Sequence, residues 1–259
     1  MKTSSLFNRK LYKTLFALVF WLALWQIISM MVGTEFLVPS PSKTLEALGA
    51  LAMKKEFWLS CLYSLIRIIL GFSLAIICGT VIAALTHKLS FVNTLLSPVL
   101  HIIKAAPVAS FIILALVWIK TDTLPIFISF LMVVPIVWQT VHTSLANIDK
   151  KEIEMGKVFG FNKWKILKFI IIPQIMPQFV SSAITSLGFA WKSGVAAEII
   201  CLPEISLGRQ LQNSKAHLET PDVFALTATI IILSLILEKL LQFMAERYLE
   251  KRRAVSENL

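Results

Sequence analysis

The sequence predicts an all-α, polytopic membrane protein with six transmembrane helices, and three observations support this fold class. Hydrophobic residues make up 57% of the 259-residue chain, whereas soluble domains hold about 45–50%. Charged residues make up only 15%, and the mean hydropathy is +0.77. The apolar residues are gathered in runs that can cross a bilayer, which takes about 20 residues for each helix. We therefore expect one transmembrane domain over 14–259, preceded by a short cytoplasmic tail over 1–13.

The candidate spans follow one another with mostly short connections. The first run is about 19 residues long, which exceeds the roughly 7–15 apolar residues of a signal peptide, so we expect it to be retained. The second run is too long for one crossing, and Ser60, Ser64 and Arg67 interrupt its first part. We expect that part at the outer interface, with the span itself beginning near Ile66. The six runs cover about 14–32, 57–86, 91–119, 125–146, 169–200 and 222–245.

Two longer connections lie on the expected outer side. Pro39 and Pro41 interrupt regular structure, and an amphipathic helix over about 41–55 is expected to open at Ser42. Leucines recur along one side of this helix, as in a helix that lies on a membrane surface. The connection over 201–222 is polar and rich in turn residues, so we expect a loop with one helical turn.

The distribution of lysine and arginine predicts the orientation. If the N-terminus is cytoplasmic, 15 of these residues fall in inside segments and six in outside segments. Because basic residues accumulate in cytoplasmic loops, both termini, the connection over 147–168 and the tail over 246–259 are expected in the cytoplasm. The same bias accounts for the net charge of +10 without a nucleic-acid partner.

The connection over 147–168 has the pattern of two short helices joined by a turn. Asp149 followed by Glu152 fits a capping box, and Asn162 can cap a second helix. Gly160 stands where a helix C-terminus favours a residue with positive φ. Between these caps, apolar residues share one face. The result is a rigid cytoplasmic knob with an apolar stripe, which suits a groove on a partner protein.

The spacing of residues in this connection resembles a family motif. A glycine follows Glu154 at +6, an isoleucine at +16 and a proline at +19, namely Gly160, Ile170 and Pro173. This resembles the "EAA" loop of permease subunits in binding-protein-dependent ABC importers, although Met155 and Gly156 stand in place of the two alanines and Ile172 in place of a leucine. The segments at 36–48, 64–79, 102–114 and 189–200 resemble the nitrate/sulfonate/taurine branch of these permeases.

The resemblance implies the type I ABC importer permease fold with a cytoplasmic coupling helix. It implies two copies of the permease, two ATPase subunits that bind ATP and Mg, and an external binding protein or lipoprotein that delivers a small anionic or vitamin-like solute. This chain would be non-catalytic and hold no cofactor, and its sequence contains no G-x-x-x-x-G-K-[ST] phosphate loop. The residues expected to couple the permease to the ATPase are Glu154, Met155, Gly156, Val158, Phe159, Gly160, Ile170 and Pro173.

Charged residues and a proline within the spans are candidates for the solute pathway. An ionisable residue inside a membrane is a functional candidate by default, which selects Lys104, Lys192 and Glu198. Pro107 can bend the third span at a gate. A direct pair between Lys192 and Glu198 is not expected, because a separation of six residues places them on different helix faces. Arg67 is expected to snorkel to the outer interface.

Two other classes of membrane protein remain as alternatives. An ion-gradient-driven secondary transporter favours acidic residues at mid-membrane, and the spans contain only Glu198 and Glu238, near their ends. A membrane-embedded enzyme needs convergent catalytic groups, whereas the four histidines are scattered and neither H-E-x-x-H nor G-x-S-x-G occurs. The three cysteines form no C-x-x-C pair, so they are interpreted as small apolar core residues.

Overall fold

The computed structural model describes the backbone of residues 3–257 and the side chains of residues 12, 13 and 15–247. Every regular element in this range is helical. In chain order the elements are α1 (Thr3–Val32), α2 (Pro41–Ala52), α3 (Lys55–Lys88), α4 (Ser90–Ala105), α5 (Val108–Ala115), α6 (Leu124–Ala146), α7 (Lys150–Val158), α8 (Lys163–Ile166), η1 (Leu167–Ile171), α9 (Ile172–Cys201), α10 (Leu207–Ala216) and α11 (Thr220–Glu257).

The six-span fold is confirmed if one bent helix pair is counted as a span. Within the described chain, five helical stretches are long and apolar enough to cross a membrane: α1, α3, α6, the stretch from α8 to α9, and α11. The bent pair is α4 and α5. The residues before Ile66 belong to the same continuous helix as the second span, because α3 runs unbroken over 34 residues. Since one crossing takes about 20 residues, the position of its first part at the outer interface stays a prediction.

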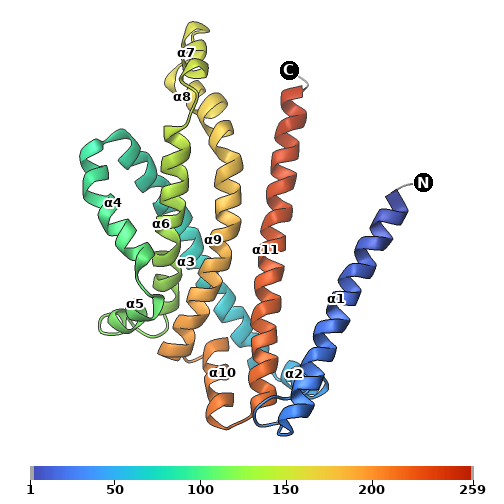
Figure 1. Ribbon diagram of the computed structural model, residues 1–259. Helices are drawn as coiled ribbons and strands as arrows, with labels where there is room; N and C mark the ends of the chain where they lie inside the picture. The colour runs from blue at the N-terminus through green and yellow to red at the C-terminus, as the bar shows by residue number, and fades with distance from the viewer. Residues whose placement is uncertain (1–2, 258–259) are drawn as a thin grey trace.

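The third expected span, over 91–119, is not one straight helix. The axes of α4 and α5 differ by 105° at a break that contains Ala106 and Pro107. Ala106 is extended, with φ −78° and ψ 146°, because the ring of a following proline disfavours the helical conformation. The chain therefore turns sharply at this point, and α4 and α5 form a hook beside α6 (Figure 1).

The core is formed by α3, α6 and α9, which lie side by side (Figure 1). Small residues allow the close approach of these helices, as is common in membrane proteins. At Gly194 of α9, an added Cβ would lie 2.5 Å from both Ile68 Cγ1 of α3 and Ser129 Oγ of α6. This glycine therefore fixes the crossing point of the three helices.

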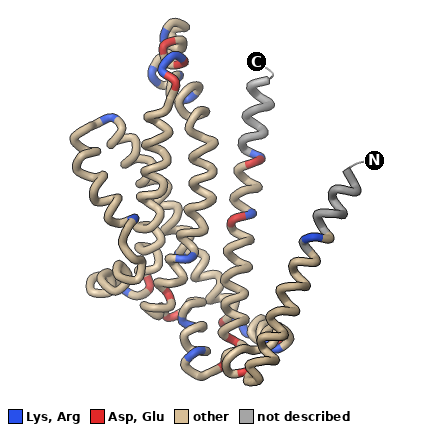
Figure 2. The backbone as a smooth tube through the Cα atoms, viewed as in Figure 1, with Lys and Arg blue, Asp and Glu red and all other residues tan. Residues whose placement is uncertain are grey.

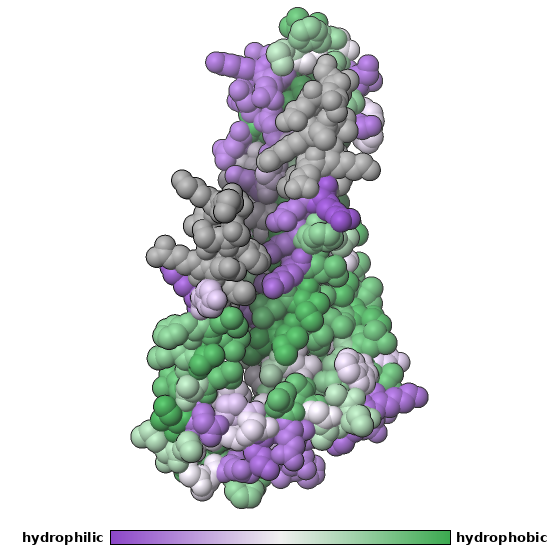
Figure 3. Space-filling model, turned by 90° about the vertical axis from the view of Figure 1, so that its right-hand side faces the viewer, coloured by the Kyte–Doolittle hydropathy of each residue, from purple (hydrophilic) through white to green (hydrophobic). Residues whose placement is uncertain are grey.

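The helix α11 packs on this core through its first turns, where Ala225 and Leu226 are fully buried. Hydrophobic residues cover the middle of the face that α1 and α11 form (Figure 3). Trp25 of α1 stacks on Phe224 of α11 with ring centroids 5.8 Å apart, and its Nε1–H donates to the carbonyl of Pro39 at 3.0 Å. Charged residues gather at the two ends of the molecule, around α7 and α8 at one end and around α2 and α10 at the other (Figure 2). An apolar belt between two charged ends is the arrangement expected of a protein that spans a bilayer.

The end formed by α2 and α10 differs from the expectation in two details. Ser40, and not Ser42, caps α2, because its Oγ accepts a hydrogen bond from the Lys43 N–H and Pro41 fills the first turn. In place of the expected single turn within 201–222, the structure has the ten-residue helix α10, which Ser206 caps. This end of the molecule is therefore more ordered than a polar loop.

Candidate functional site

Three features could serve transport, and the first is the knob formed by α7 and α8. The Asp149 carboxylate caps α7 by accepting from the Lys151 N–H at 2.8 Å. The expected reciprocal bond from Glu152 is replaced by Gln174 of α9, whose Oε1 accepts from the Asp149 N–H at 3.3 Å and whose Nε2 donates to Glu152 at 2.6 Å. The start of α7 is therefore tied directly to α9.

The turn after α7 has the expected positive-φ glycine. Gly160 has φ +72°, and its N–H donates to the carbonyl of Lys157 at 3.0 Å. The Phe161 N–H donates to the carbonyl of Gly156 at 2.9 Å, which completes a Schellman motif. Asn162 then caps α8 by accepting from the Lys165 N–H at 2.8 Å, as the sequence predicted.

The connection from α8 to α9 contains one turn of π-helix, η1. Pro173 has no N–H to donate to Phe169, and its ring would collide with the carbonyl of Phe169 in a regular helix. The wider turn accommodates the proline, and the Ile172 N–H donates to the carbonyl of Leu167, five residues earlier. The helical path thus continues from α8 through η1 into α9 without an intervening loop.

The two faces of α7 have different environments. Gly156 is buried against α8 and η1, where an added Cβ would lie 2.6 Å from Ile170 Cδ1. On the other face, Met155, Val158 and Phe159 are 55%, 86% and 73% exposed. The residues predicted to couple to an ATPase therefore divide into those that seat the helix and those that are available to a partner, while Glu154 and Pro173 are also exposed.

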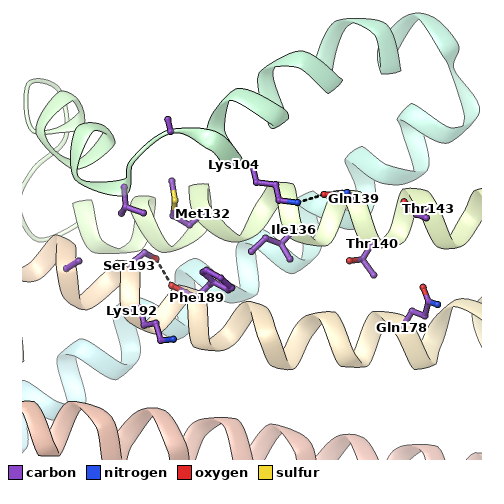
Figure 4. Close-up of a pocket in the computed structure, with 13 residues that line it drawn as sticks. Lys104, Met132, Ile136, Gln139, Thr140, Thr143, Gln178, Phe189, Lys192 and Ser193 are labelled. Atoms are coloured by element: carbon purple, nitrogen blue, oxygen red, sulfur yellow. Dashed lines mark hydrogen bonds between the residues drawn. The ribbon is translucent and has the colours of Figure 1, made fainter.

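The second feature is a cavity of about 810 Å³ between α4, α6 and α9. Lys104 and Lys192 both line it, whereas the other two expected pathway residues do not. Pro107 lies at the break between α4 and α5, and Glu198 is fully buried in the core. The Lys104 Nζ of α4 donates to Gln139 Oε1 of α6 at 2.6 Å (Figure 4).

Further polar and aromatic residues that were not predicted from the sequence complete the cavity, among them Gln139, Gln178 and Phe189. The two glutamines could have been found by the argument that selected the lysines, because an amide inside an apolar span also marks a polar environment. The sequence carries no comparable signal for Phe189.

The third feature is a buried polar network around Glu198, close to the α10 end. Glu198 Oε2 accepts from Ser64 Oγ at 2.7 Å and from the Gly208 N–H at 3.3 Å. Its Oε1 lies 3.6 Å from Arg67 Nη1 and has no hydrogen-bond partner within the described residues.

Arg67 extends this network to two further segments. Its Nη1 donates to the carbonyl of Ile205 at 2.7 Å, and its Nη2 donates to Asp122 at 3.1 Å. The side chain is only 11% exposed, so protein groups surround most of it, and its position at the outer interface stays a prediction. The guanidinium joins α3 to α9, to the segment before α6 and to the segment before α10.

Comparisons with known proteins agree on one family. A family model described as "Binding-protein-dependent transport system inner membrane component" matches residues 71–254. The taurine transport system permease protein TauC of Escherichia coli is 24% identical over 220 residues, which are 83% of this chain and 80% of the relative. The nitrate import permease protein NrtB of Synechococcus elongatus is 26% identical over 192 residues, which are 70% of this chain and 68% of the relative.

Solved structures show the same fold. A chain of an amino acid ABC transporter solved with histidines matches with a TM-score of 0.59 at 16% identity, over 71% of this chain and 90% of that chain. The MetNI methionine ABC transporter in an inward-facing conformation matches with a TM-score of 0.54 at 16% identity, over 75% of this chain and 93% of that chain. These relatives confirm the resemblance to the nitrate/sulfonate/taurine branch of ABC importer permeases. They exclude the two alternatives from the sequence, a secondary transporter and a membrane-embedded enzyme. The chain belongs to the binding-protein-dependent transport system inner membrane components and is the permease subunit of an ABC importer, without ATPase chemistry of its own.

Proposed function

We propose that α7 is the coupling helix, through which two ATPase subunits drive a pair of copies of this permease. One observation carries the proposal: Met155, Val158 and Phe159 form an exposed apolar face on a helix whose opposite face is fixed. Exposed apolar faces of this kind fit hydrophobic grooves on partner proteins. The partner's groove would receive Val158 and Phe159, while the partner itself holds ATP and Mg.

The connection between α7 and the solute cavity supports this role. Gln174 ties the start of α7 to α9, and Gly156 seats its middle against Ile170 of η1. From η1 the helix continues into α9, which carries Phe189 and Lys192 into the cavity. A displacement of α7 would therefore reach the cavity wall as a rigid-body movement.

ATP drives such a movement only if the ATPase pair binds the two states of the permease with different affinity. When ATP closes the ATPase subunits, the two α7 helices would move together and rotate α9 relative to α3 and α6. The cavity would then change from opening at the α7 end to opening at the α10 end. The solute, delivered by an external binding protein at the α10 end, would enter in the second state and leave in the first.

The proposed role of α7 also predicts how the chain is oriented in the membrane. Lysines crowd α7, α8 and η1, and basic residues favour the cytoplasmic side. The ends of α1 and α11 that carry the chain termini point toward the same side as α7 (Figure 1). Both termini and α7 would therefore be cytoplasmic, and α2 and α10 would face the binding protein.

A matched pair of substitutions tests the docking role. Val158→Asp places a charge in the apolar face, and Met53→Asp makes the same change at a residue that is 90% exposed at the opposite end. A buried interface anchor contributes about 2 kcal/mol or more, so Val158→Asp should lower co-purification of the ATPase subunit at least about thirtyfold and abolish ATP-dependent uptake. Met53→Asp should leave co-purification unchanged. Normal co-purification with Val158→Asp would show that α7 does not dock the ATPase.

A further inference from the structure

We propose that the cavity between α4, α6 and α9 is a binding site of the permease itself, selective for a small organic anion with an apolar body, such as a sulfonate or carboxylate. This inference rests on the proposed function only in taking the cavity as part of the solute pathway. It places solute selection within the membrane domain and not solely in the external binding protein.

The charge of the cavity points to an anion. Among the residues that line it, Lys104 and Lys192 are basic and none is acidic. The Lys104 ammonium has three donors, of which Gln139 takes one. Within the described part of the chain, no side chain or carbonyl accepts from the Lys192 ammonium, and no carboxylate lies within ion-pair distance of either lysine. Both lysines are exposed, so their ammonium groups are accessible to a solute. A cation without an acidic partner in a membrane span commonly marks a pathway for charged solutes.

The apolar part of the lining points to an organic anion. In Figure 4, Ile136 of α6 and Phe189 of α9 lie between the two lysine side chains, and Met132 lies beside them. An inorganic ion occupies a few water volumes of about 30 Å³ each, which is a small part of the 810 Å³ cavity. A solute with an apolar body would contact the phenyl ring and the isoleucine while its anionic group reaches an ammonium. Cavities of about 300–1,000 Å³ with a few placed polar groups are typical of small-molecule sites.

A second hollow offers the anion a route away from the lysines. A cavity of about 420 Å³ shares Ile136, Thr140 and Gln178 with the first, and Ser181, Ser182 and Thr185 continue its wall along α9. These residues precede Phe189 in α9, so the hollow lies toward the α7 end. Hydroxyl and amide groups hold an anion less strongly than an ammonium does. Conduction requires binding that is weak enough to allow release, and this decrease in charge along α9 meets that requirement.

Binding measurements on the full-length protein in lipid nanodiscs test the proposal. The probes are 1-butanesulfonate, 1-butanol, butylammonium and nitrate, measured by calorimetry and by the shift in melting temperature. We expect 1-butanesulfonate to bind, nitrate to bind more weakly, and the neutral and cationic analogues not to bind. At least one of Lys104→Gln and Lys192→Gln should weaken 1-butanesulfonate binding about tenfold or more, because it removes a charge-assisted hydrogen bond.

Three control variants separate the possible outcomes. Lys192→Arg retains the charge and should keep most of the affinity, which separates loss of the ammonium from misfolding. Lys88→Gln changes an exposed lysine at the end of α3, outside the cavity, and should have no effect. Val158→Asp should also bind 1-butanesulfonate normally, so failure of the coupling proposal is distinguishable from failure of this one. Equal binding of 1-butanol and 1-butanesulfonate, unchanged affinity in both glutamine variants, or no binding of 1-butanesulfonate to the intact protein would each overturn the inference.

Discussion

Substitution of Arg67 by methionine should destabilise the permease strongly, although Arg67 lies outside both the knob and the cavity. The side chain joins four segments through Asp122, the carbonyl of Ile205 and Glu198. Methionine keeps much of the volume of the arginine stem but none of its donors. The substitution therefore removes the positive charge next to Glu198 and leaves the packing largely in place.

The expected loss of stability follows from the burial of Glu198, which is 0% exposed. Its Oε1 has no hydrogen-bond partner among the described residues and depends on Arg67 at 3.6 Å. Breaking a buried ion pair by removing one partner costs about 3–5 kcal/mol. For a chain of this size, about 2–4 °C of melting temperature corresponds to each kcal/mol, so the melting temperature should fall by about 6–20 °C.

A double-mutant cycle in nanodiscs measures this effect. Glu198→Gln keeps an acceptor for Ser64 and the Gly208 N–H but carries no charge, so the double variant with Arg67→Met should be more stable than Arg67→Met alone. The matched control is Arg209→Met. Among the described residues, the Arg209 side chain makes only an exposed contact with the carbonyl of Glu204 at 3.5 Å, so its loss should cost less than about 1 kcal/mol. If Arg67→Met is no more destabilising than Arg209→Met, or if Glu198→Gln brings no rescue, the buried charge does not depend on Arg67.

Three further changes test the knob and the core. Gly160→Val forces a β-branched residue to φ +72°, at a cost above about 1–2 kcal/mol, and should leave ATP hydrolysis in place while uptake is lost; normal uptake per ATP hydrolysed would contradict the role of this turn. Gly194→Ala should lower the melting temperature, because the new Cβ would overlap α3 and α6, at a cost of about 1–3 kcal/mol. Gly49→Ala, which meets nothing within 4 Å, should instead be neutral or slightly stabilising, and equal effects of the two would refute the close approach at Gly194. Gln174→Ala removes two hydrogen bonds at the start of α7, so hydrogen exchange of the α7 amides should be faster by about tenfold, and unchanged exchange would show that α7 is held by other contacts.

The knob could be predicted from the sequence in some detail because its determinants are local. Asp149, Gly160 and Asn162 act on backbone groups within three or four residues of themselves. A cap or a positive-φ glycine therefore leaves a signature within a single helical turn. The π-helical turn before Pro173 has a local cause too, but a proline is compatible with several kinds of distortion. The sequence therefore does not predict which kind of helix distortion forms before Pro173.

The network around Glu198 could not be predicted because its members are distant in the sequence. Ser64 and Glu198 are 134 residues apart, and Arg67 and Asp122 are 55 apart. Only the packing of α3 against α9 brings these groups together, and no periodicity in either helix specifies that register. Residue type alone favoured an interfacial Arg67 and a pathway role for Glu198. The lysines of the cavity were found because a charge in an apolar run is visible without knowledge of its partners.

The coupling of α7 to an ATPase subunit is tested most directly by a photo-crosslinking residue in place of Phe159, in the intact importer. The side chain is 73% exposed on the apolar face of α7, so it should capture the ATP-binding subunit, and the yield should change when ATP is added. The same residue in place of Met53, at the opposite end, should capture none of that subunit. Absence of any such crosslink from position 159, in an assembly that still hydrolyses ATP and takes up solute, would contradict the account.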